Sequence, residues 1–349
     1  METSKIQSIL EELGYKLYDQ GSYWQCSALY RNGDNKTALQ IYKDSGTWKD
    51  YVRSTPFMPF KLLVSLTLKT EDENVLSKYI SKDESFFLLK DGHRQQEKLE
   101  MEKIYPNSCI KELLPHYKFY NQKGIDSKIL QQLHGGYATK GKMYQRFVFP
   151  IYNEHQQIHG FSGRDMASQS DRPKWKHIGR KKQWVYPAYV PNKSNTIGDN
   201  FSQDYVIIVE SIGDCLNLMQ HGFNNVLVSF GLDISSKLLC FLVEKDFKKI
   251  FISLNNDLSK KDNIGLESSV KNYLKFLNYF DKDKIKICLP NKNDFGDMNE
   301  SDFKVWSEKF NSLKDIDQVP KIKSYADELS KKKLLSKALS KQLKNLHEA

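Results

Sequence analysis

Three short apolar runs in the second half of the chain each end in side chains that carry oxygen ligands. The runs and their donors are 205–209 with Glu210 and Asp214, 250–254 with Asn255 and Asp257, and 285–289 with Asp294 and Asp297. In an open α/β sheet, side chains just past the carboxyl ends of the strands meet at one edge. Such a cluster suits Mg²⁺, which takes one or two carboxylates, keeps several waters and binds phosphates. Turn residues are commonly polar, but three such endings in order favour metal-dependent phosphate chemistry.

The motifs at these strand ends resemble the TOPRIM fold of DnaG-type DNA primases. The segment 209–214, V-E-S-I-G-D, is similar to that family's V-E-G-x-x-D, with Ser211 in place of the glycine. The segment 254–257, L-N-N-D, lies where the family has D-x-D, and 293–297, N-D-F-G-D, resembles its last acidic motif in the spacing of T-even phage primases. Three upstream segments resemble the family's R-x-x-F-P-I, G-F-x-G-R and P-K-Y, namely 146–151 (R-F-V-F-P-I), 160–164 (G-F-S-G-R) and 173–175 (P-K-W). All six motifs follow the family's order and lie within residues 115–300.

The resemblance implies a fold and a reaction. It implies an α/β (α+β) protein in which a Rossmann-like TOPRIM sheet follows an N-terminal primase-core subdomain. The implied activity is that of a DNA primase, a nucleotidyltransferase that makes short RNA primers from NTPs on a single-stranded DNA template. Mg²⁺ is the implied cofactor, with Mn²⁺ as a possible substitute, and two ions would bridge the acidic edge and the nucleotide phosphates.

The resemblance also assigns roles to individual residues. Glu210 is expected to be essential, and Asp214 and Asp257 are expected to take part in catalysis with it. The expected metal ligands are Glu210, Asn255, Asp257, Asp294 and Asp297. A nucleotidyl transfer gathers negative charge on phosphates, which Arg and Lys side chains stabilise. The expected nucleotide and template contacts are Arg146, Arg164, Lys174 and, by a looser match, Lys182.

One departure from the family's pattern leaves other functions open. Asn255 stands where the first aspartate of D-x-D is expected. An amide oxygen can bind Mg²⁺ but contributes no charge, so this position should bind the ion more weakly. The alternatives are therefore a catalytically weakened primase-like module that binds single-stranded DNA, or another TOPRIM enzyme such as a topoisomerase or nuclease. The retained Glu210 and Asp214 argue against the first alternative, and the basic motifs at Arg146 and Lys174 argue against the second.

The N-terminal region, residues 1–60, predicts a small β module. Short alternating runs at 23–26, 30–31, 38–42 and 46–51 are typical of strands with turns between them. The layout resembles the zinc ribbon of DnaG-type primases, but only Cys26 stands where four Cys or His ligands are needed. We therefore expect a ribbon-like module without zinc, or an unrelated β module. Its possible single-stranded-DNA face comprises Arg31, Lys36, Trp48, Lys49 and Tyr51.

The other boundaries follow from changes in pattern. Residues 61–110 are expected to form a helical connector, 111–200 the N-terminal subdomain of the primase core, 201–300 the TOPRIM domain and 301–349 a basic helical tail. In the tail, Leu335, Leu339, Leu343 and Leu346 recur at helical spacing. This amphipathic helix could pack on the body or, as the resemblance implies, residues 321–349 could meet a replicative helicase.

The composition is consistent with this interpretation but would not suggest it alone. The chain of 349 residues has 53 Lys and Arg against 43 Asp and Glu, a formal net charge of +10 that suits a polyanionic partner. No apolar run approaches the length of a membrane span, and the N-terminus lacks the apolar core of a signal peptide. Five scattered cysteines without a C-x-x-C pair suit a reducing cytoplasm, that of the host if the protein belongs to a phage.

Overall fold

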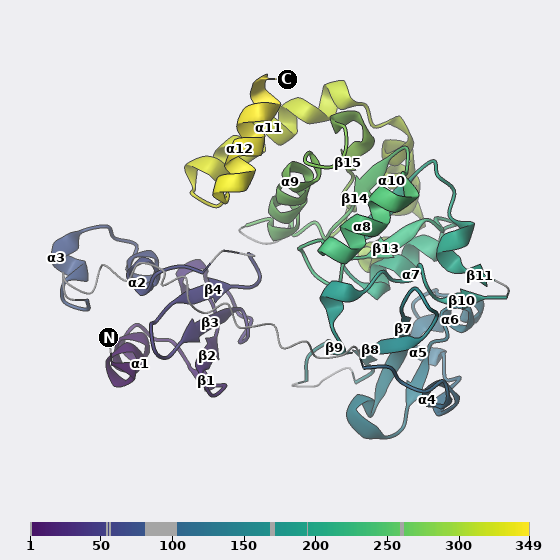
Figure 1. Ribbon diagram of the computed structural model, residues 1–349, viewed down its shortest axis with the longest axis horizontal. Helices are drawn as coiled ribbons and strands as arrows, with labels where there is room; N and C mark the ends of the chain where they lie inside the picture. The colour runs from purple at the N-terminus through teal and green to yellow at the C-terminus, as the bar shows by residue number, and fades with distance from the viewer. Residues whose placement is uncertain are drawn as a thin grey trace. The chain divides into compact units, whose positions relative to one another are not determined.

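The computed structural model describes residues 2–53, 55, 57–80, 103–167, 172–193, 195–258 and 262–348. The chain divides into two compact units, Met1–Glu100 and Met101–Ala349, and most of their helices and strands are labelled in Figure 1. Much of the expected connector, residues 81–102, lies outside the described residues.

The first unit is an antiparallel sheet with helices on one face. Its elements are α1 (Thr3–Glu12), β1 (Tyr18–Asp19), β2 (Tyr23–Cys26), β3 (Leu39–Tyr42), β4 (Trp48–Asp50), α2 (Phe60–Leu68) and α3 (Glu73–Leu76). The strands pair in the order β1-β2-β3-β4. Side chains alternate between buried and half-buried along the strands, as the sequence pattern predicts for a sheet with one covered face. Trp24, Ile41 and Trp48 are buried on the covered face, in one core with residues of α1 and α2.

The expected strand at Tyr30 and Arg31 is wrong. These residues form a 3-10 turn, η1 (Leu29–Arg31). Tyr30 Oη donates to Asp50 Oδ2 at 2.7 Å, and Arg31 Nε donates to the same oxygen at 2.8 Å. Successive side chains of a strand point to opposite faces, so two neighbours can reach one carboxylate only if the backbone turns.

Asp50 is the polar centre of this unit. Its fully buried carboxylate also accepts the backbone N–H groups of Val52 at 2.9 Å and Arg53 at 3.1 Å. It thus ties η1 to the turn that follows β4. A buried carboxylate is tolerated only when it is paired and hydrogen-bonded, and here both conditions are met.

The second unit contains an antiparallel sheet followed by a parallel one. The first part comprises α4 (Ser108–Lys111), β5 (Leu113–Leu114), α5 (Lys118–Asn121), α6 (Ser127–Gln132), β6 (Gly136–Ala138), β7 (Arg146–Tyr152), β8 (Ile158–Asp165) and β9 (Trp175–Ile178), with strand order β5-β6-β7-β8-β9. A short β10 (Pro191–Asn192) and β11 (Asn195–Thr196) hairpin follows. The second part comprises β12 (Val206–Val209), α7 (Ile212–Gln220), β13 (Val226–Val228), α8 (Ser236–Lys245), β14 (Ile250–Ile252), α9 (Ile264–Phe276), β15 (Ile285–Ile287) and α10 (Glu300–Ser312).

The parallel sheet is buried on both faces, as its continuous apolar strands predict. All four strands run parallel in the order β13-β12-β14-β15. Ile207 and Val209 pack toward α7, α10 and the antiparallel sheet, whereas Ile208 and Ile252 pack toward α8 and α9. The expected mixed α/β fold is therefore confirmed, and the three strands that precede the acidic motifs, β12, β14 and β15, are adjacent.

After α10, the rest of the expected tail forms two helices that pack on the same unit. They are α11 (Asp315–Lys331) and α12 (Lys337–Glu348), which join the core shared by α8 and α9 (Figure 1). Leu343 and Leu346 are buried there, so the apolar side of the last helix packs on the body of the protein. Within the described residues, the helices are too short or too polar to cross a membrane.

We predict that Asp50→Asn destabilises the first unit by about 3–5 kcal/mol, because it removes the buried charge that pairs with the half-buried Arg31 guanidinium. Hydrogen exchange of the β2–β4 amides and denaturant unfolding would measure the loss. Asp19→Asn is the matched control, since Asp19 pairs with Lys43 on the surface at 2.7 Å and should change exchange little. Equal effects of the two variants would contradict the role of Asp50.

Candidate functional site

Hydrogen bonds join the three acidic segments at one edge of the parallel sheet. Asn256 N, in the loop after β14, donates to the carbonyl of Asn293 at 2.7 Å, and its Nδ2 donates to the carbonyl of Pro290 at 2.8 Å. Phe295 N, in the loop after β15, donates to Asp214 Oδ1 at 3.2 Å. The carboxyl ends of β12, β14 and β15 thus carry connected loops, as the sequence pattern predicts.

Asp214 holds this edge together. Its Oδ2 accepts the N–H of Ser211 at 3.1 Å and the hydroxyl of Ser211 at 2.7 Å, which closes a capping box at the start of α7. Burial and the nearby Asp294 carboxylate raise the pKa of Asp214 to about 6. Both of its oxygens are occupied by the protein, so we assign Asp214 a positioning role. Ser211, which replaces the family's glycine, supplies the cap.

Glu210 lies directly after β12 and is half-buried. The basic side chain near it is Lys181, which lies in η4 (Lys181–Gln183) and donates from Nζ to the carbonyl of Phe230 at 3.1 Å. Burial lowers the pKa of Lys181, and the Glu210 carboxylate opposes that shift. The resemblance pointed to the neighbouring Lys182; both lysines are exposed to solvent, and it is Lys181 whose pKa the Glu210 carboxylate affects. Three consecutive basic residues at 180–182 marked the segment, but not which of them lies near Glu210.

The loop after β14 is held in place by hydrogen bonds to the residue that caps α9. Asn263 caps α9 by accepting Leu266 N at 3.0 Å, accepts the N–H of Asp257 at 3.1 Å, and donates to Asn256 Oδ1 at 2.7 Å. Asp257 is buried and Asn255 is half-buried. A Cβ placed on Gly265 would overlap the carbonyl oxygen of Asn255. This loop therefore depends on a glycine in the first turn of α9.

The loop after β15 ends in a 3-10 turn, η7 (Phe295–Asp297). Asp294 caps this turn by accepting Asp297 N at 3.0 Å, and Asp297 is exposed. Asp294 is close enough to Asp214 and Arg164 to affect the pKa values of both, raising each. Burial outweighs that effect at Arg164, and its pKa is lowered overall. Asp294 is thus the carboxylate that links the acidic edge to a basic side chain.

The expected basic contacts have different environments. Arg164 lies over the rings of Phe119 and Trp175, each 5.9 Å from its guanidinium carbon, and donates to the carbonyl of Lys174 at 3.3 Å. A Cβ on Gly213 would lie 4.0 Å from the ring of Trp175, which places β9 against the start of α7. The side chain of Lys174 is exposed.

Arg146 was expected to contact the nucleotide, but its guanidinium is enclosed by its own chain. It donates from Nη1 to the carbonyls of Gly163 at 3.2 Å and Pro173 at 3.0 Å, and Nη2 lies 3.7 Å from Asp165. Its side chain is only 3% exposed. In this conformation Arg146 on β7 is bonded to β8 and to the residue two positions before β9, because the carbonyls that it binds belong to the residues immediately before Arg164 and Lys174.

The strand-end edge fits Mg²⁺ as a ligand set completed by water and phosphate. Among the described residues, no three His, Cys, Asp or Glu side chains are grouped to hold a metal ion by themselves. Mg²⁺ does not require three, because it keeps waters and binds substrate phosphates. Within the described structure, Ser253 Oγ and Asn293 Oδ1 are buried at the same loops without a hydrogen-bond partner. Polar groups left unpaired in this way usually bind water or an ion.

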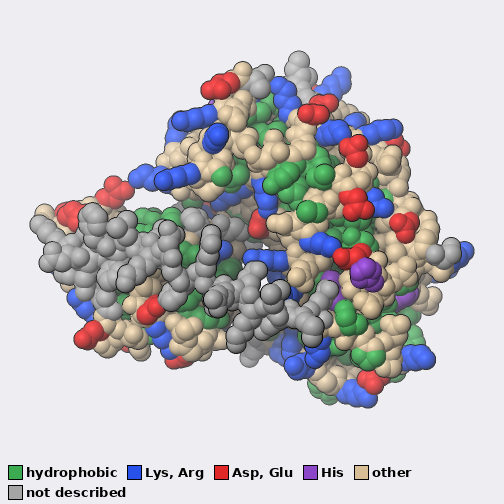
Figure 2. Space-filling model, in the orientation of Figure 1, with side chains coloured by type: hydrophobic (Ala, Val, Ile, Leu, Met, Phe, Trp, Pro, Cys, Tyr) green, Lys and Arg blue, Asp and Glu red, His purple; other side chains and the backbone are tan. Residues whose placement is uncertain are grey.

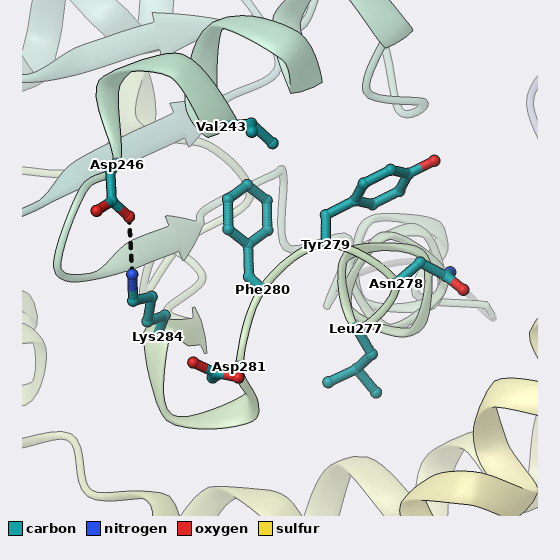
Figure 3. A pocket seen from close by; sticks show the side chains of 8 residues that line it. All are labelled: Val243, Asp246, Leu277, Asn278, Tyr279, Phe280, Asp281 and Lys284. Atoms are coloured by element: carbon teal, nitrogen blue, oxygen red, sulfur yellow. Dashed lines mark hydrogen bonds and ion pairs between the residues drawn. The ribbon is translucent and has the colours of Figure 1, made fainter.

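A hollow of about 300 Å³ lies elsewhere, at the opposite edge of the parallel sheet (Figure 3). Val243, Tyr279 and Phe280 line it, together with Asp246 and Lys284, which form an ion pair at 2.8 Å. Because this hollow is formed where α8 and α9 end, it lies at the amino ends of β14 and β15. Asp281 also lines it, and the hollow contains none of the residues expected to do chemistry.

The outer face of the first unit's sheet carries aromatic side chains, although two expected members are absent from it. Trp48 is buried in the core, and Arg31 is paired with Asp50. Of the exposed aromatic residues, Tyr51 was expected and Phe57 was not, and Lys49 Nζ lies 5.0 Å and 5.5 Å from their ring centres. The rings of Phe57 and Tyr42 lie 5.8 Å apart, and those of Tyr42 and Tyr23 lie 6.0 Å apart.

We predict that Gly265→Ala lowers the free energy of unfolding by about 1–3 kcal/mol, the usual effect of overpacking. It should also speed hydrogen exchange in the loop 253–257, because the Asn255 carbonyl must move. Gly213→Ala is the matched control in the first turn of α7, where the added Cβ meets only ordinary contacts. A Gly265→Ala protein as stable as the control, with an unchanged loop, would show that the close approach is not required.

Comparison with known proteins gives sequence relatives of one kind. No model of a known protein family matches the chain. A DNA primase of Clostridium acetobutylicum is 24% identical over 260 residues, 62% of this chain and 42% of the relative. A DNA primase of Legionella pneumophila is 26% identical over 163 residues, 45% of this chain and 27% of the relative. The chain therefore spans less than half the length of these curated relatives.

Among solved structures, the zinc-binding and RNA polymerase domains of the Aquifex aeolicus primase match with a TM-score of 0.49 and 16% identity, covering 99% of this chain and 95% of that one. The conclusion rests on the sequence relatives. Over a large part of its length, this chain is similar to bacterial DNA primases.

Proposed function

We propose that this protein is a DNA primase that makes short RNA primers on single-stranded DNA by Mg²⁺-dependent nucleotidyl transfer. The observation that carries the proposal is that hydrogen bonds join the loops carrying Glu210, Asp257 and Asp294 at one edge of a parallel sheet. The Glu210 carboxylate affects the pKa of Lys181, and the Asp294 carboxylate affects that of Arg164, so both basic groups are near this edge. Carboxylates for a metal and cations for phosphates then occupy the same edge, which is the combination that phosphoryl-type transfer needs. The similarity to bacterial DNA primases supports the same reaction.

In this proposal each group acts on a defined part of the substrate. Glu210, Asp257, Asp294 and Asp297 would hold Mg²⁺, or Mn²⁺ in its place, with Asn255 as a neutral ligand. The metal ions supply charge neutralisation at the reacting phosphate and a more acidic primer hydroxyl. Lys181 and Arg164 bind triphosphate oxygens, and Arg suits two-point contacts. Asp214 keeps α7 and the loop after β15 in register.

A second candidate rests on Asn255. With an amide in place of the first aspartate, the edge has one carboxylate fewer and should bind cations more weakly. The protein would then be a primase-like module that binds single-stranded DNA and catalyses poorly. Asn255→Asp separates the two: a restored charge that turns a nearly inactive protein into an active one would favour the module, whereas a change confined to the Mg²⁺ requirement would favour the enzyme.

Three further expectations stay proposals. A phage setting rests only on the spacing of 293–297. The absence of zinc rests on the single cysteine of the first unit, Cys26, which is buried beneath the sheet; elemental analysis of the purified protein tests it. A helicase contact through residues 321–349 would have to use the outward side of α12, because Leu343 and Leu346 are buried against the protein's own core.

We predict that Glu210→Gln lowers primer synthesis by at least about a hundredfold, an effect of the order seen when a catalytic electrostatic group is removed. Folding and DNA binding should be nearly unchanged, because the amide keeps the shape of the side chain. Labelled NTPs on a single-stranded DNA template measure the rate. Glu244→Gln, at an exposed site on α8, is the control and should stay active. Near wild-type synthesis by Glu210→Gln would refute the proposed metal edge.

We also predict that the outer face of the first unit's sheet contacts the single-stranded template. Tyr51→Ala should weaken binding of single-stranded DNA by about tenfold, since stacking of a base on an aromatic ring contributes about 1–3 kcal/mol. Fluorescence anisotropy with a labelled oligonucleotide measures the change. Tyr279→Ala removes an equally exposed tyrosine from the hollow of Figure 3 and should bind DNA normally. If Tyr279→Ala weakens binding as much as Tyr51→Ala, the sheet face is not the template site.

A further inference from the structure

The last two helices carry an unusual charge pattern. Residues 331–347 contain six lysines and no acidic residue. The lysines are Lys331, Lys332, Lys333, Lys337, Lys341 and Lys344. The proposed reaction at the strand-end edge makes no use of any of them, and such a run needs either solvent or a polyanionic partner.

The apolar side of α12 is already occupied. Leu343 and Leu346 are each 4% exposed and belong to the core that also contains α8, α9 and α11. Polar contacts fix the helix in place, since Gln342 Nε2 bonds to Asn278 Oδ1 and His347 Nε2 lies 2.9 Å from Asp327 Oδ1. A helix that inserts into a membrane or into a groove of a partner needs its apolar side free. That mode of binding is therefore closed to α12 as it is folded here.

The lysines lie on the opposite side of the helix. Lys337, Lys341 and Lys344 are spaced by four and three residues, which places them in one stripe about 10 Å long. All three are exposed, and in the described part of the chain none of them has an ion-pair or hydrogen-bond partner. Some lysines elsewhere in the same unit do have acidic partners: Lys237 lies 2.9 Å from Glu154, and Lys248 lies 2.8 Å from Asp204.

We propose that this lysine stripe, together with the lysines of the α11–α12 turn, is a surface that binds the phosphate backbone of nucleic acid. Lys and Arg side chains are visible over this helical pair in Figure 2. Lysine ammonium groups act as point charges without a fixed geometry, so they bind phosphates irrespective of base sequence. Unpaired charges held on a rigid, self-packed helix lose no ion pair when they meet a phosphate. This surface goes beyond primer synthesis, because it is independent of the carboxylates at the strand ends.

The salt dependence of binding tests the proposal directly. The slope of log affinity against log salt for single-stranded nucleic acid changes by about 0.7 for each phosphate that a protein cation neutralises. The triple variant Lys337→Gln, Lys341→Gln and Lys344→Gln should therefore flatten the slope by about 2. Lys and Gln have similar helix propensities, so circular dichroism and thermal unfolding should match the wild type. Affinity for single-stranded DNA should fall at low salt regardless of base sequence.

A matched control removes the same charge from another place. Lys237→Gln, Lys248→Gln and Lys284→Gln together replace three lysines that are ion-paired with acids, and this variant should keep a near wild-type slope. Equal flattening by both triple variants would mean that only overall charge matters, and would overturn the proposal. An unchanged slope in the α12 variant would also overturn it.

If that variant binds DNA normally but loses stimulation of priming by a replicative helicase, the surface belongs to a protein partner instead. The Glu210→Gln variant, which should not make primers, should keep the wild-type slope of log affinity against log salt. That result would separate binding at this surface from the proposed reaction.

Discussion

The strand-end edge of the parallel sheet depends on the hydrogen bonds of one buried carboxylate, that of Asp214. It caps α7 through Ser211 and accepts the N–H of Phe295, so the helix after the first core strand is tied to the loop after the last one. The loop between them is attached in turn by the bond from Asn256 to Asn293. A charged group in this position is costly unless it is fully bonded, and the raised pKa of Asp214 reflects that cost. The bonds also explain why Asp214 is better placed to organise the edge than to bind a metal.

The two sheets of the second unit meet where charge of opposite sign is needed. Trp175 on β9 lies near Gly213 at the start of α7, and Arg164 on β8 lies over that tryptophan. Arg146 donates hydrogen bonds to the carbonyls of Gly163 and Pro173, and so connects the same strands. One buried arginine thus shapes the backbone that presents the other. Removing Arg146 and removing Arg164 should for this reason have different consequences, the first for structure and the second for charge at the edge.

Sequence patterns identified the parts that depend on local chemistry. Continuous apolar runs ending in acids predicted the parallel strands and placed Glu210, Asp257 and Asp294 at one edge, and the structure joins the loops that carry them. Alternating runs predicted three strands of the first unit, and the leucine spacing predicted α12. These features are visible in sequence because helix and strand periods, and the polarity of strand ends, are properties of neighbouring residues.

Only the tertiary structure decided what each side chain does. Tyr30 and Arg31 turn because a carboxylate twenty residues away, Asp50, pairs with both. Lys181 and Lys182 share one 3-10 turn, yet it is Lys181 whose pKa the Glu210 carboxylate affects. Arg146 is enclosed because carbonyls from two other segments surround it. The sequence by itself therefore determined which elements form and which residues cluster at their ends. Burial, pairing and orientation came from contacts between distant segments, which no local pattern encodes.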